Sequence, residues 1–218
     1  MRFERVRPFV DGAAHENQTA YKKGHSVPML VAVMCSAIKR IAARGRGVYG
    51  AITDFHKAFD MVSRSGLLLT LHGIGVKGRN LRLIHDDMTS GWAEVVYERI
   101  HSQRIPSGGG TGQGSVESGP FFNLYMKPVL LKCLNIASAL SYGLNLACLT
   151  YSDDGFRGTK SLSDLQKVVD AETVELAKLN MKVNPSKSKV IKYSRKRLVR
   201  SEFENEPDII IDGVPIKW

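Results

Sequence analysis

The sequence predicts an α+β fold in one large domain or two small lobes. Three observations favour it. The chain has 218 residues and is 43% hydrophobic, so it is long and apolar enough to bury a core. Several windows repeat apolar residues at i, i+3, i+4 and i+7, which is typical of amphipathic helices. Short apolar runs bounded by glycine and other turn residues lie between those windows and predict strands.

The first half of the chain alternates predicted helices and strands. A helix is expected over 27–43, where glycines end it, and a buried strand follows over 48–55. Two more helices are expected over 63–71 and 78–90. Residues 92–99 alternate apolar and acidic side chains, which predicts a half-exposed strand.

The second half opens on a stretch rich in glycine, 107–119, whose composition alone indicates a flexible loop. A buried helix is expected over 120–139, and the Asp212-Gly213 pair inside 209–216 indicates a hairpin with a tight turn. The remaining predicted elements are a strand over 144–151, a partner strand starting at Phe156, a helix over 162–179 and a strand over 190–193.

The charge of the chain is strongly basic. Lysine and arginine number 31 against 21 acidic residues, a formal net charge of +10. Such a balance favours a polyanionic partner, because lysine and arginine neutralise phosphate groups in non-specific nucleic-acid binding. General solubility is the alternative explanation of the same charge.

The three cysteines, Cys35, Cys133 and Cys148, lack the spacing of metal ligands and lie among apolar residues. They are expected to be small core residues in an intracellular reducing compartment. The basic N-terminus has no apolar signal core, and a mitochondrial or nuclear location stays open. Residues 133–152 carry no charge, but polar residues interrupt them, so no membrane partner is expected.

The tetrapeptide Tyr151-Ser152-Asp153-Asp154 places two adjacent carboxylates at the tip of a predicted hairpin. Like charges repel there, and a divalent cation would resolve the conflict. Asp54 ends another predicted strand and would join them if the strands are neighbours. Mg²⁺ takes oxygen ligands, and two such ions can hold the attacking and leaving oxygens of a phosphoryl transfer. The alternative is that these aspartates only cap turns.

Five segments occur in an order that resembles a known family. The segments are NQTAYKKGHS (17–26), DFHKAFD (54–60), GTGQG (110–114) followed by FNL (122–124), YSDD (151–154) and NMKVNPSKS (180–188). They resemble the motifs Q-x-G-F-R-x-G-R-S, D-x-x-K-A-F-D, G-x-R-Q-G with L-F-N, Y-A-D-D and G-L-x-x-N-x-x-K-[ST]. These motifs belong to the reverse transcriptases of non-LTR retrotransposons and their group II intron relatives.

The resemblance implies a polymerase palm, a ferredoxin-like antiparallel sheet with packed helices, plus partial fingers and no thumb. Residues 1–46 would be partial fingers. Residues 47–200 would be the palm, interleaved with finger segments at about 72–108. Residues 201–218 would form the hairpin that precedes a missing thumb.

The resemblance also implies roles at the metal site. Asp54 and Asp153 would be the main ligands of two Mg²⁺ ions, with Asp154 beside them. The backbone carbonyl of Phe55 would complete the metal shell. Phe59 would be the steric gate against a ribose 2′-hydroxyl, although the same ring also fits a core position.

Further roles concern the nucleotide and the nucleic acid. Gln113 and Gly114 would line the nucleotide and template pocket, and Lys187 would approach the leaving pyrophosphate. Lys22 and Lys23 would reach triphosphate or template phosphates, although they also fit a solvated face. The basic segment around Arg195, Lys196 and Arg197 would bind nucleic acid.

Departures from the motifs leave two functions open. Gly112 replaces an arginine, Glu117 adds an acid to the loop and His25 replaces another arginine. One function is RNA-templated DNA synthesis with two Mg²⁺, on RNA with primer DNA. The other is a domesticated, inactive palm that binds RNA as a structural part of a large ribonucleoprotein, such as a mitochondrial or other organelle ribosome. In either case other protein chains are expected as partners.

Overall fold

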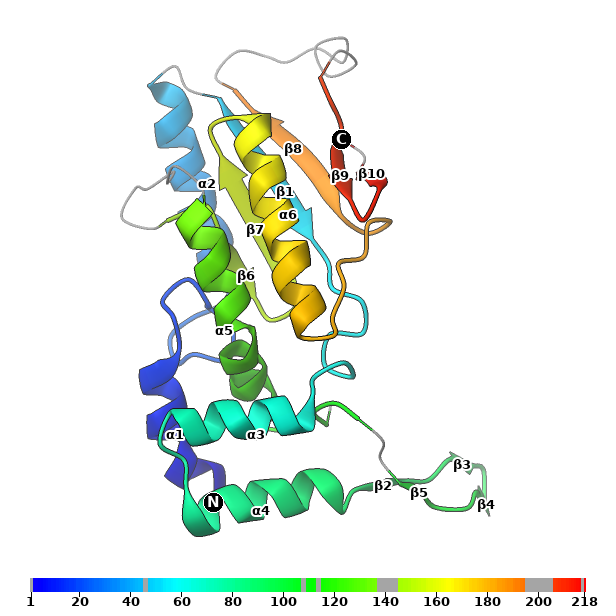
Figure 1. The fold of residues 1–218 in the computed structure, drawn as a ribbon. Coiled ribbons are helices and arrows are strands. Elements are labelled where there is room, and N and C mark those ends of the chain that lie inside the picture. Colours follow the sequence, from blue (N-terminus) through cyan, green and yellow to red (C-terminus); the bar gives the residue numbers. More distant parts are fainter. Residues whose placement is uncertain are drawn as a thin grey trace.

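A computed structural model describes residues 2–44, 47–106, 109–112, 115–136, 145–194, 206–216 and 218. The helices and strands lie as labelled in Figure 1. The helices are α1 Arg2–Ala13, α2 Val27–Ala43, α3 Arg64–Gly73, α4 Gly78–Thr89, α5 Ser118–Ile136 and α6 Leu162–Lys178. The strands are β1 Val48–Thr53, β2 Trp92–Ala93, β3 Val96–Tyr97, β4 Ile100–His101, β5 Ile105–Pro106, β6 Leu149–Tyr151, β7 Asp154–Thr159, β8 Lys189–Tyr193, β9 Ile209–Ile211 and β10 Val214–Ile216.

The central sheet has the strand order β6-β7-β1-β8, and every named pair in it is antiparallel. Taken in chain order, the four strands follow the ferredoxin-like order, and the prediction of such a sheet is confirmed. Thr53 of β1 pairs with Gly155 of β7, and Tyr151 of β6 pairs with Asp154 of β7. The end of β1 and the turn between β6 and β7 therefore lie at the same end of the sheet, the lower end in Figure 1.

Helices cover the two faces of the sheet unequally. Helices α5 and α6 pack side by side on one face, and α2 lies on the other (Figure 1). Side chains alternate along β1, so Ala51 joins the α5–α6 core while Val48 joins the cluster under α2. On the α2 face, Ile52, Ile191 and Tyr193 keep between 37% and 42% of their surface exposed. Ile52 lies next to the end that carries Asp54, whereas Tyr193 pairs with Val48 at the opposite end.

Helix α1 lies outside the sheet and was not predicted. Phe3, Val6 and Val10 are buried, and the Phe3 ring meets Phe121 of α5 edge-on at 5.8 Å. The three apolar residues have helical spacing, but the arginines and Pro8 between them hide it. None of the described helices is both long and apolar enough to cross a membrane.

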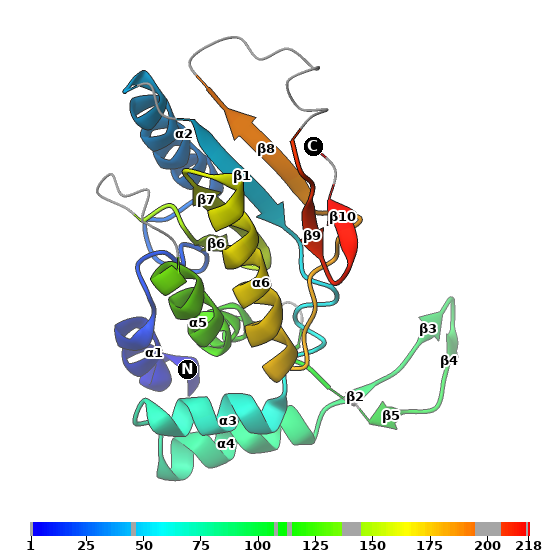
Figure 2. The ribbon, with the colours of Figure 1, turned by 45° about the horizontal axis from the view of Figure 1, so that its top comes forward.

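Beyond the lower end of the sheet, α3 and α4 lie side by side and an arm projects from them (Figure 2). The prediction of one half-exposed strand over 92–99 is wrong. The arm consists of two short antiparallel pairs, β2–β5 and β3–β4, and Val95 and Tyr97 are 65% and 72% exposed. Alternation predicts a strand with one buried face, whereas this arm has solvent on both faces.

A buried ion pair joins the sheet to α6. Arg157 of β7 and Glu172 of α6 form a salt bridge and are 1% and 0% exposed. The Arg157 guanidinium also donates to the carbonyls of Leu149 and Phe156, at 3.2 and 3.1 Å. Thr53 donates its hydroxyl to Glu172 at 3.4 Å. The pair thus connects β1, β6, β7 and α6 directly beneath the end of the sheet where Asp54 lies.

Glu172→Gln should lower the free energy of unfolding by about 3–5 kcal/mol, because it leaves the Arg157 guanidinium as an uncompensated buried charge. The matched control is Glu175→Gln on the same helix, which removes the ion pair with the exposed Lys178. That change should cost about 0–1 kcal/mol. Urea denaturation measures both, and equal losses would contradict this role for Glu172.

Candidate active site

Three carboxylates gather where the strands end. Asp54 follows β1, Asp153 lies in the two-residue turn between β6 and β7, and Asp154 begins β7. The pairing of Thr53 with Gly155 brings Asp54 next to Asp154 in space, although 100 residues of chain separate them. The backbone therefore places the three acids at one end of the sheet, and their role as one site stays a prediction.

The acids influence one another electrostatically. Partial burial raises the pKa of Asp154, and the charges of Asp153 and Asp54 raise it further. Lys187, from the loop before β8, places its Nζ 3.8 Å from Oδ2 of Asp54. Its side chain is 68% exposed, so this contact is a weak, solvent-screened pair. The site thus retains an excess of negative charge.

The backbone around Asp54 is held from the same loop. Its carbonyl accepts a hydrogen bond from the Asn184 amide at 2.7 Å, and its amide donates to the Ser188 hydroxyl at 3.4 Å. The chain around 184–188 therefore fixes Asp54 and carries Lys187 toward it.

The donor set suits a hard divalent cation, because clustered carboxylate oxygens are the ligands that Mg²⁺ and Mn²⁺ prefer. As the side chains stand, no three His, Cys, Asp or Glu residues within the described ranges form a ready ligand cluster. The suitability of this site for a divalent cation therefore rests on the carboxylate oxygens of Asp54, Asp153 and Asp154 and on the repulsion between their charges.

Phe55 is buried and forms an isolated antiparallel bridge with Val183. The hydrogen bonds of this bridge run from the Asn184 amide to the Asp54 carbonyl and from the His56 amide to the Lys182 carbonyl. Phe55 and Val183 are thus a pair that exchanges no hydrogen bonds. This pairing leaves the Phe55 carbonyl beside Asp54 unused.

Phe59 is half-buried and stacks on Phe122 of α5, with ring centroids 4.7 Å apart. Its carbonyl accepts a hydrogen bond from the Thr111 amide at 3.0 Å. Gly110 has φ +70°, and a Cβ there would lie 2.5 Å from the Phe59 oxygen, so only glycine fits. Arg64 donates to the Gly109 and Gly110 carbonyls, both at 3.1 Å.

The described part of the glycine-rich stretch is therefore anchored against the Phe59 loop, although composition alone indicated a flexible loop. Gln113 and Gly114, expected to line the nucleotide pocket, lie outside the described residues. Arg195, Lys196 and Arg197 do too.

Residues 17–20 connect the site to α5 and β6, a role that the sequence did not reveal. The Thr150 amide donates to the Asn17 carbonyl and the Thr19 amide to the Thr150 carbonyl, both at 3.0 Å. The Asn123 side chain donates to the Ala20 carbonyl at 2.8 Å. Asn17, Gln18, Thr19 and Asn123 are buried, and their side chains donate to backbone carbonyls rather than reach solvent.

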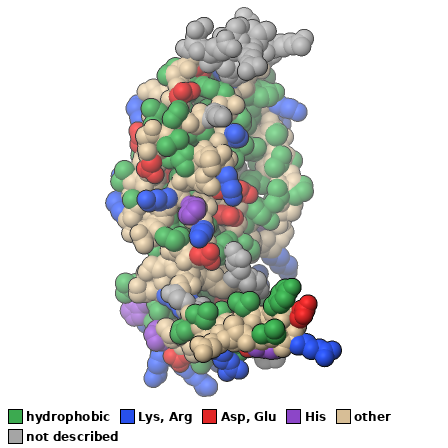
Figure 3. Space-filling view, turned by 90° about the vertical axis from the view of Figure 1, so that its right-hand side faces the viewer, with side chains coloured by type: hydrophobic (Ala, Val, Ile, Leu, Met, Phe, Trp, Pro, Cys, Tyr) green, Lys and Arg blue, Asp and Glu red, His purple; other side chains and the backbone are tan. Residues whose placement is uncertain are grey.

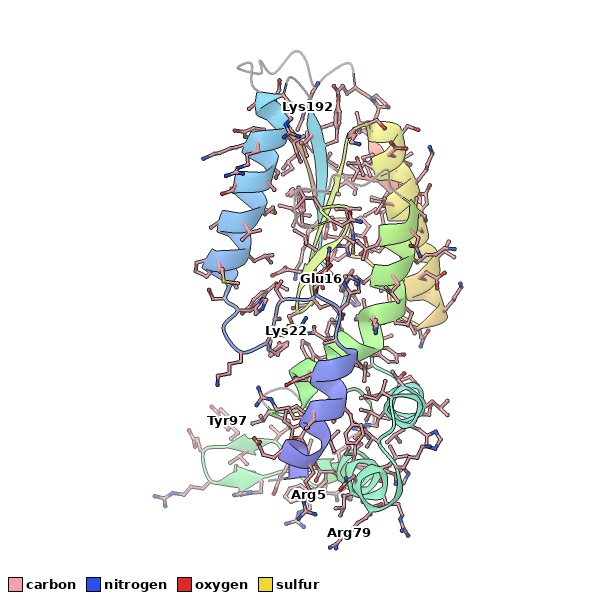
Figure 4. All side chains as sticks on the ribbon, turned by 90° about the vertical axis from the view of Figure 1, so that its left-hand side faces the viewer. Arg5, Glu16, Lys22, Arg79, Tyr97 and Lys192 are labelled. Atoms are coloured by element: carbon pink, nitrogen blue, oxygen red, sulfur yellow. The ribbon has the colours of Figure 1, made fainter. Side chains whose placement is uncertain are left out.

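Lys22 and Lys23 follow this segment and differ in their surroundings. Lys22 is half-buried, donates to the His15 carbonyl at 2.6 Å and has a pKa lowered by burial. Lys23 is exposed. Figure 4 shows Lys22 near the chain that follows α1, far from Lys192 at the other end of the sheet. Phosphate contact by Lys22 would therefore require it to leave the His15 carbonyl.

Figure 3 shows one face of the molecule, with acidic, basic and histidine side chains gathered at mid-height. A band of hydrophobic side chains crosses the lower part of this face, where the arm points toward the viewer.

Three comparisons with known proteins agree with this architecture. Residues 3–200 match the family model described as reverse transcriptase (RNA-dependent DNA polymerase). The chain is 27% identical over 177 residues to the retrovirus-related Pol polyprotein from type-1 retrotransposable element R2 of Bradysia coprophila. That match covers 81% of this chain and 20% of the polyprotein.

Solved telomerases share the fold. Apo telomerase from Candida tropicalis truncated from its C-terminal domain has a TM-score of 0.64 at 16% identity, over 90% of this chain and 41% of the telomerase. Candida tropicalis telomerase in complex with a fragment of telomeric RNA has a TM-score of 0.65 at 15% identity, over 89% and 33% of the two chains. The chain thus spans less than half the length of these relatives. It belongs to the reverse transcriptase (RNA-dependent DNA polymerase) family, with a relative of the non-LTR retrotransposon type.

Proposed function

We propose that this chain is the catalytic core of an RNA-templated DNA polymerase. The observation that carries the proposal is the convergence of Asp54, Asp153 and Asp154 at one end of the sheet, two of them on neighbouring strand ends. Phosphoryl transfer needs little covalent chemistry from a protein, and positioned negative oxygens that bind Mg²⁺ are its central requirement.

In this proposal Asp54 and Asp153 would hold two Mg²⁺ ions, with Asp154 and the Phe55 carbonyl beside them. The bound ions would neutralise charge on the attacking and leaving oxygens. Lys187, now 3.8 Å from Asp54, would turn toward the triphosphate as a mobile cation. The Phe59 ring, which stacks on Phe122, would exclude a ribose 2′-hydroxyl from the nucleotide site.

The surroundings offer a path for nucleic acid. The open part of the sheet beside Ile52, Ile191 and Tyr193 leads to the carboxylates and would take a template–primer duplex. The net charge of +10 favours RNA and DNA as partners. The sheet with α5 and α6 would be the palm, and α4 with the arm would be finger segments. Further protein segments or chains would hold the duplex, as the relatives' greater length suggests.

A second candidate is an RNA-binding component of a larger ribonucleoprotein that no longer polymerises, such as one in an organelle ribosome. The net charge favours RNA binding without requiring catalysis. The hydrogen bond from Lys22 to the His15 carbonyl also favours it, because the resemblance assigns this lysine to phosphate contact and here it binds the protein's own backbone. The two candidates differ in whether the carboxylates matter for function.

Primer extension on an RNA template separates them. The wild-type chain, with Mg²⁺, should extend a DNA primer, and Asp153→Asn should reduce the rate by about 10²–10³-fold, because charge stabilisation in the transition state is lost. Asp208→Asn, an exposed aspartate outside the site, is the control and should retain the rate. Equal extension by the wild type and Asp153→Asn would contradict the polymerase proposal.

RNA binding tests the second candidate. Fluorescence anisotropy measures the affinity for a structured RNA. The logarithm of the association constant should fall linearly with the logarithm of the salt concentration, because basic side chains displace counterions from RNA. Asp153→Asn should bind at least as tightly as the wild type, because it removes a negative charge. Salt-independent binding would count against a phosphate-contacting surface.

Asp154→Asn should stabilise the chain at neutral pH in the absence of divalent ions. The folded state raises the pKa of Asp154, so folding is favoured below its unfolded pKa and loses that contribution as pH rises through the folded pKa. The gain over the wild type, seen in thermal unfolding, should therefore shrink as pH falls into the acid range. Mg²⁺ should stabilise the wild type more than the variant. Asp208→Asn again serves as control, and a pH-independent gain would refute the electrostatic cause.

A further inference from the structure

The turn that carries Asp153 is strained at Ser152. Tyr151 pairs with Asp154, so Ser152 and Asp153 are the two central residues of a tight hairpin turn. Ser152 has φ +59°, while Asp153 is not left-handed. This is the pattern of a type II′ turn, whose first central position favours glycine. A serine in this conformation is strained, so another contact must stabilise it.

Tyr21 supplies that contact. Its hydroxyl and the Ser152 hydroxyl share a hydrogen bond of 2.9 Å. Tyr21 itself has φ +62°, which is unusual for a bulky residue. Two strained residues, 131 positions apart in the chain, are thus joined through their side chains.

The Tyr21 ring is 46% exposed and packs against the protein on one side. It lies against the backbone of Gly119 in α5, where a Cβ would be 2.4 Å from the ring. The residues before it are tied to Thr150 and to Asn123 by the hydrogen bonds given above. The backbone next to Tyr21 is thus hydrogen-bonded to β6 and α5, and its hydroxyl lies beside the turn.

The sequence supports a paired role for these two positions. The family motifs have phenylalanine and alanine where this chain has Tyr21 and Ser152. Neither of those side chains carries a hydroxyl, so the two departures occur together at the two positions that touch. Both hydroxyl groups of the Tyr21–Ser152 hydrogen bond are therefore groups that the motif residues lack.

We propose that Tyr21 is a positioning residue for the carboxylates. Its hydroxyl holds Ser152 in the left-handed conformation and so fixes the direction in which Asp153 leaves the turn relative to Asp54. This role rests on the proposed metal-dependent function. Groups that orient metal ligands commonly change metal affinity 10–100-fold when removed.

Mn²⁺ binding measured by electron paramagnetic resonance tests the proposal on the whole chain. Tyr21→Phe keeps the ring and removes only the hydroxyl, and should weaken Mn²⁺ binding about 10-fold. Ser152→Ala should weaken it similarly, and the double variant should be no weaker than either single one. Tyr97→Phe, on the exposed arm, is the matched control and should bind as the wild type does.

Ser152→Gly is a second variant that removes the hydroxyl and the backbone strain together, so it folds even where Ser152→Ala does not. Because glycine takes the left-handed conformation without the Tyr21 contact, this variant should bind Mn²⁺ more tightly than Ser152→Ala does. Urea unfolding of the single and double variants measures the hydrogen bond independently of the metal.

The outcomes separate the two proposals. If Asp153→Asn abolishes Mn²⁺ binding while Tyr21→Phe stays within twofold of the wild type, the role of Tyr21 is overturned and the proposed function stands. Losses that simply add in the double variant also overturn the role. If the wild type binds no Mn²⁺, the proposed function fails, and the role of Tyr21 fails with it.

Discussion

The antiparallel register between β1 and β7 is the constraint on which the rest of the structure depends. Pairing of Thr53 with Gly155 sets Asp54 beside Asp154, and a shift by one residue would turn one set of acids to the opposite face. Gly155 permits this register, because a Cβ there would lie 2.6 Å from both the Arg157 guanidinium and the Thr53 hydroxyl. The buried Arg157–Glu172 pair then fills the space that glycine leaves open.

Around the acids, three glycines let another group of the protein approach the backbone more closely than a side chain would permit. Gly110 admits the Phe59 carbonyl, Gly119 admits the Tyr21 ring and Gly155 admits Arg157. The first two contacts join segments that are distant in the chain, whereas the third lies within β7. Close packing at these glycines supports the surroundings of the site, while its charged groups stay near solvent.

Much of the fold could be predicted because its signals are local. Helix α2 has the predicted bounds 27–43, with Ser26 as its cap, and Asp212-Gly213 does form the turn between β9 and β10. Strand ends alone also predicted that Asp54 would lie near Asp153 and Asp154 if their strands are neighbours, and β1 and β7 are neighbours. The partners of Asn17 and Tyr21 could not be predicted, because their hydrogen bonds reach residues about 130 positions away. The arm could not either, since alternation does not tell a half-buried strand from one that is exposed on both sides.

The bridge between Gln18 and Thr150 closes a loop that contains most of the chain. Contacts of such separation are slow to form, because the entropy of the intervening chain must be lost first. During synthesis, the segment that carries Tyr21 emerges long before the strand it joins. The carboxylate end of the sheet therefore cannot be completed before the strand that carries Thr150 has been synthesised.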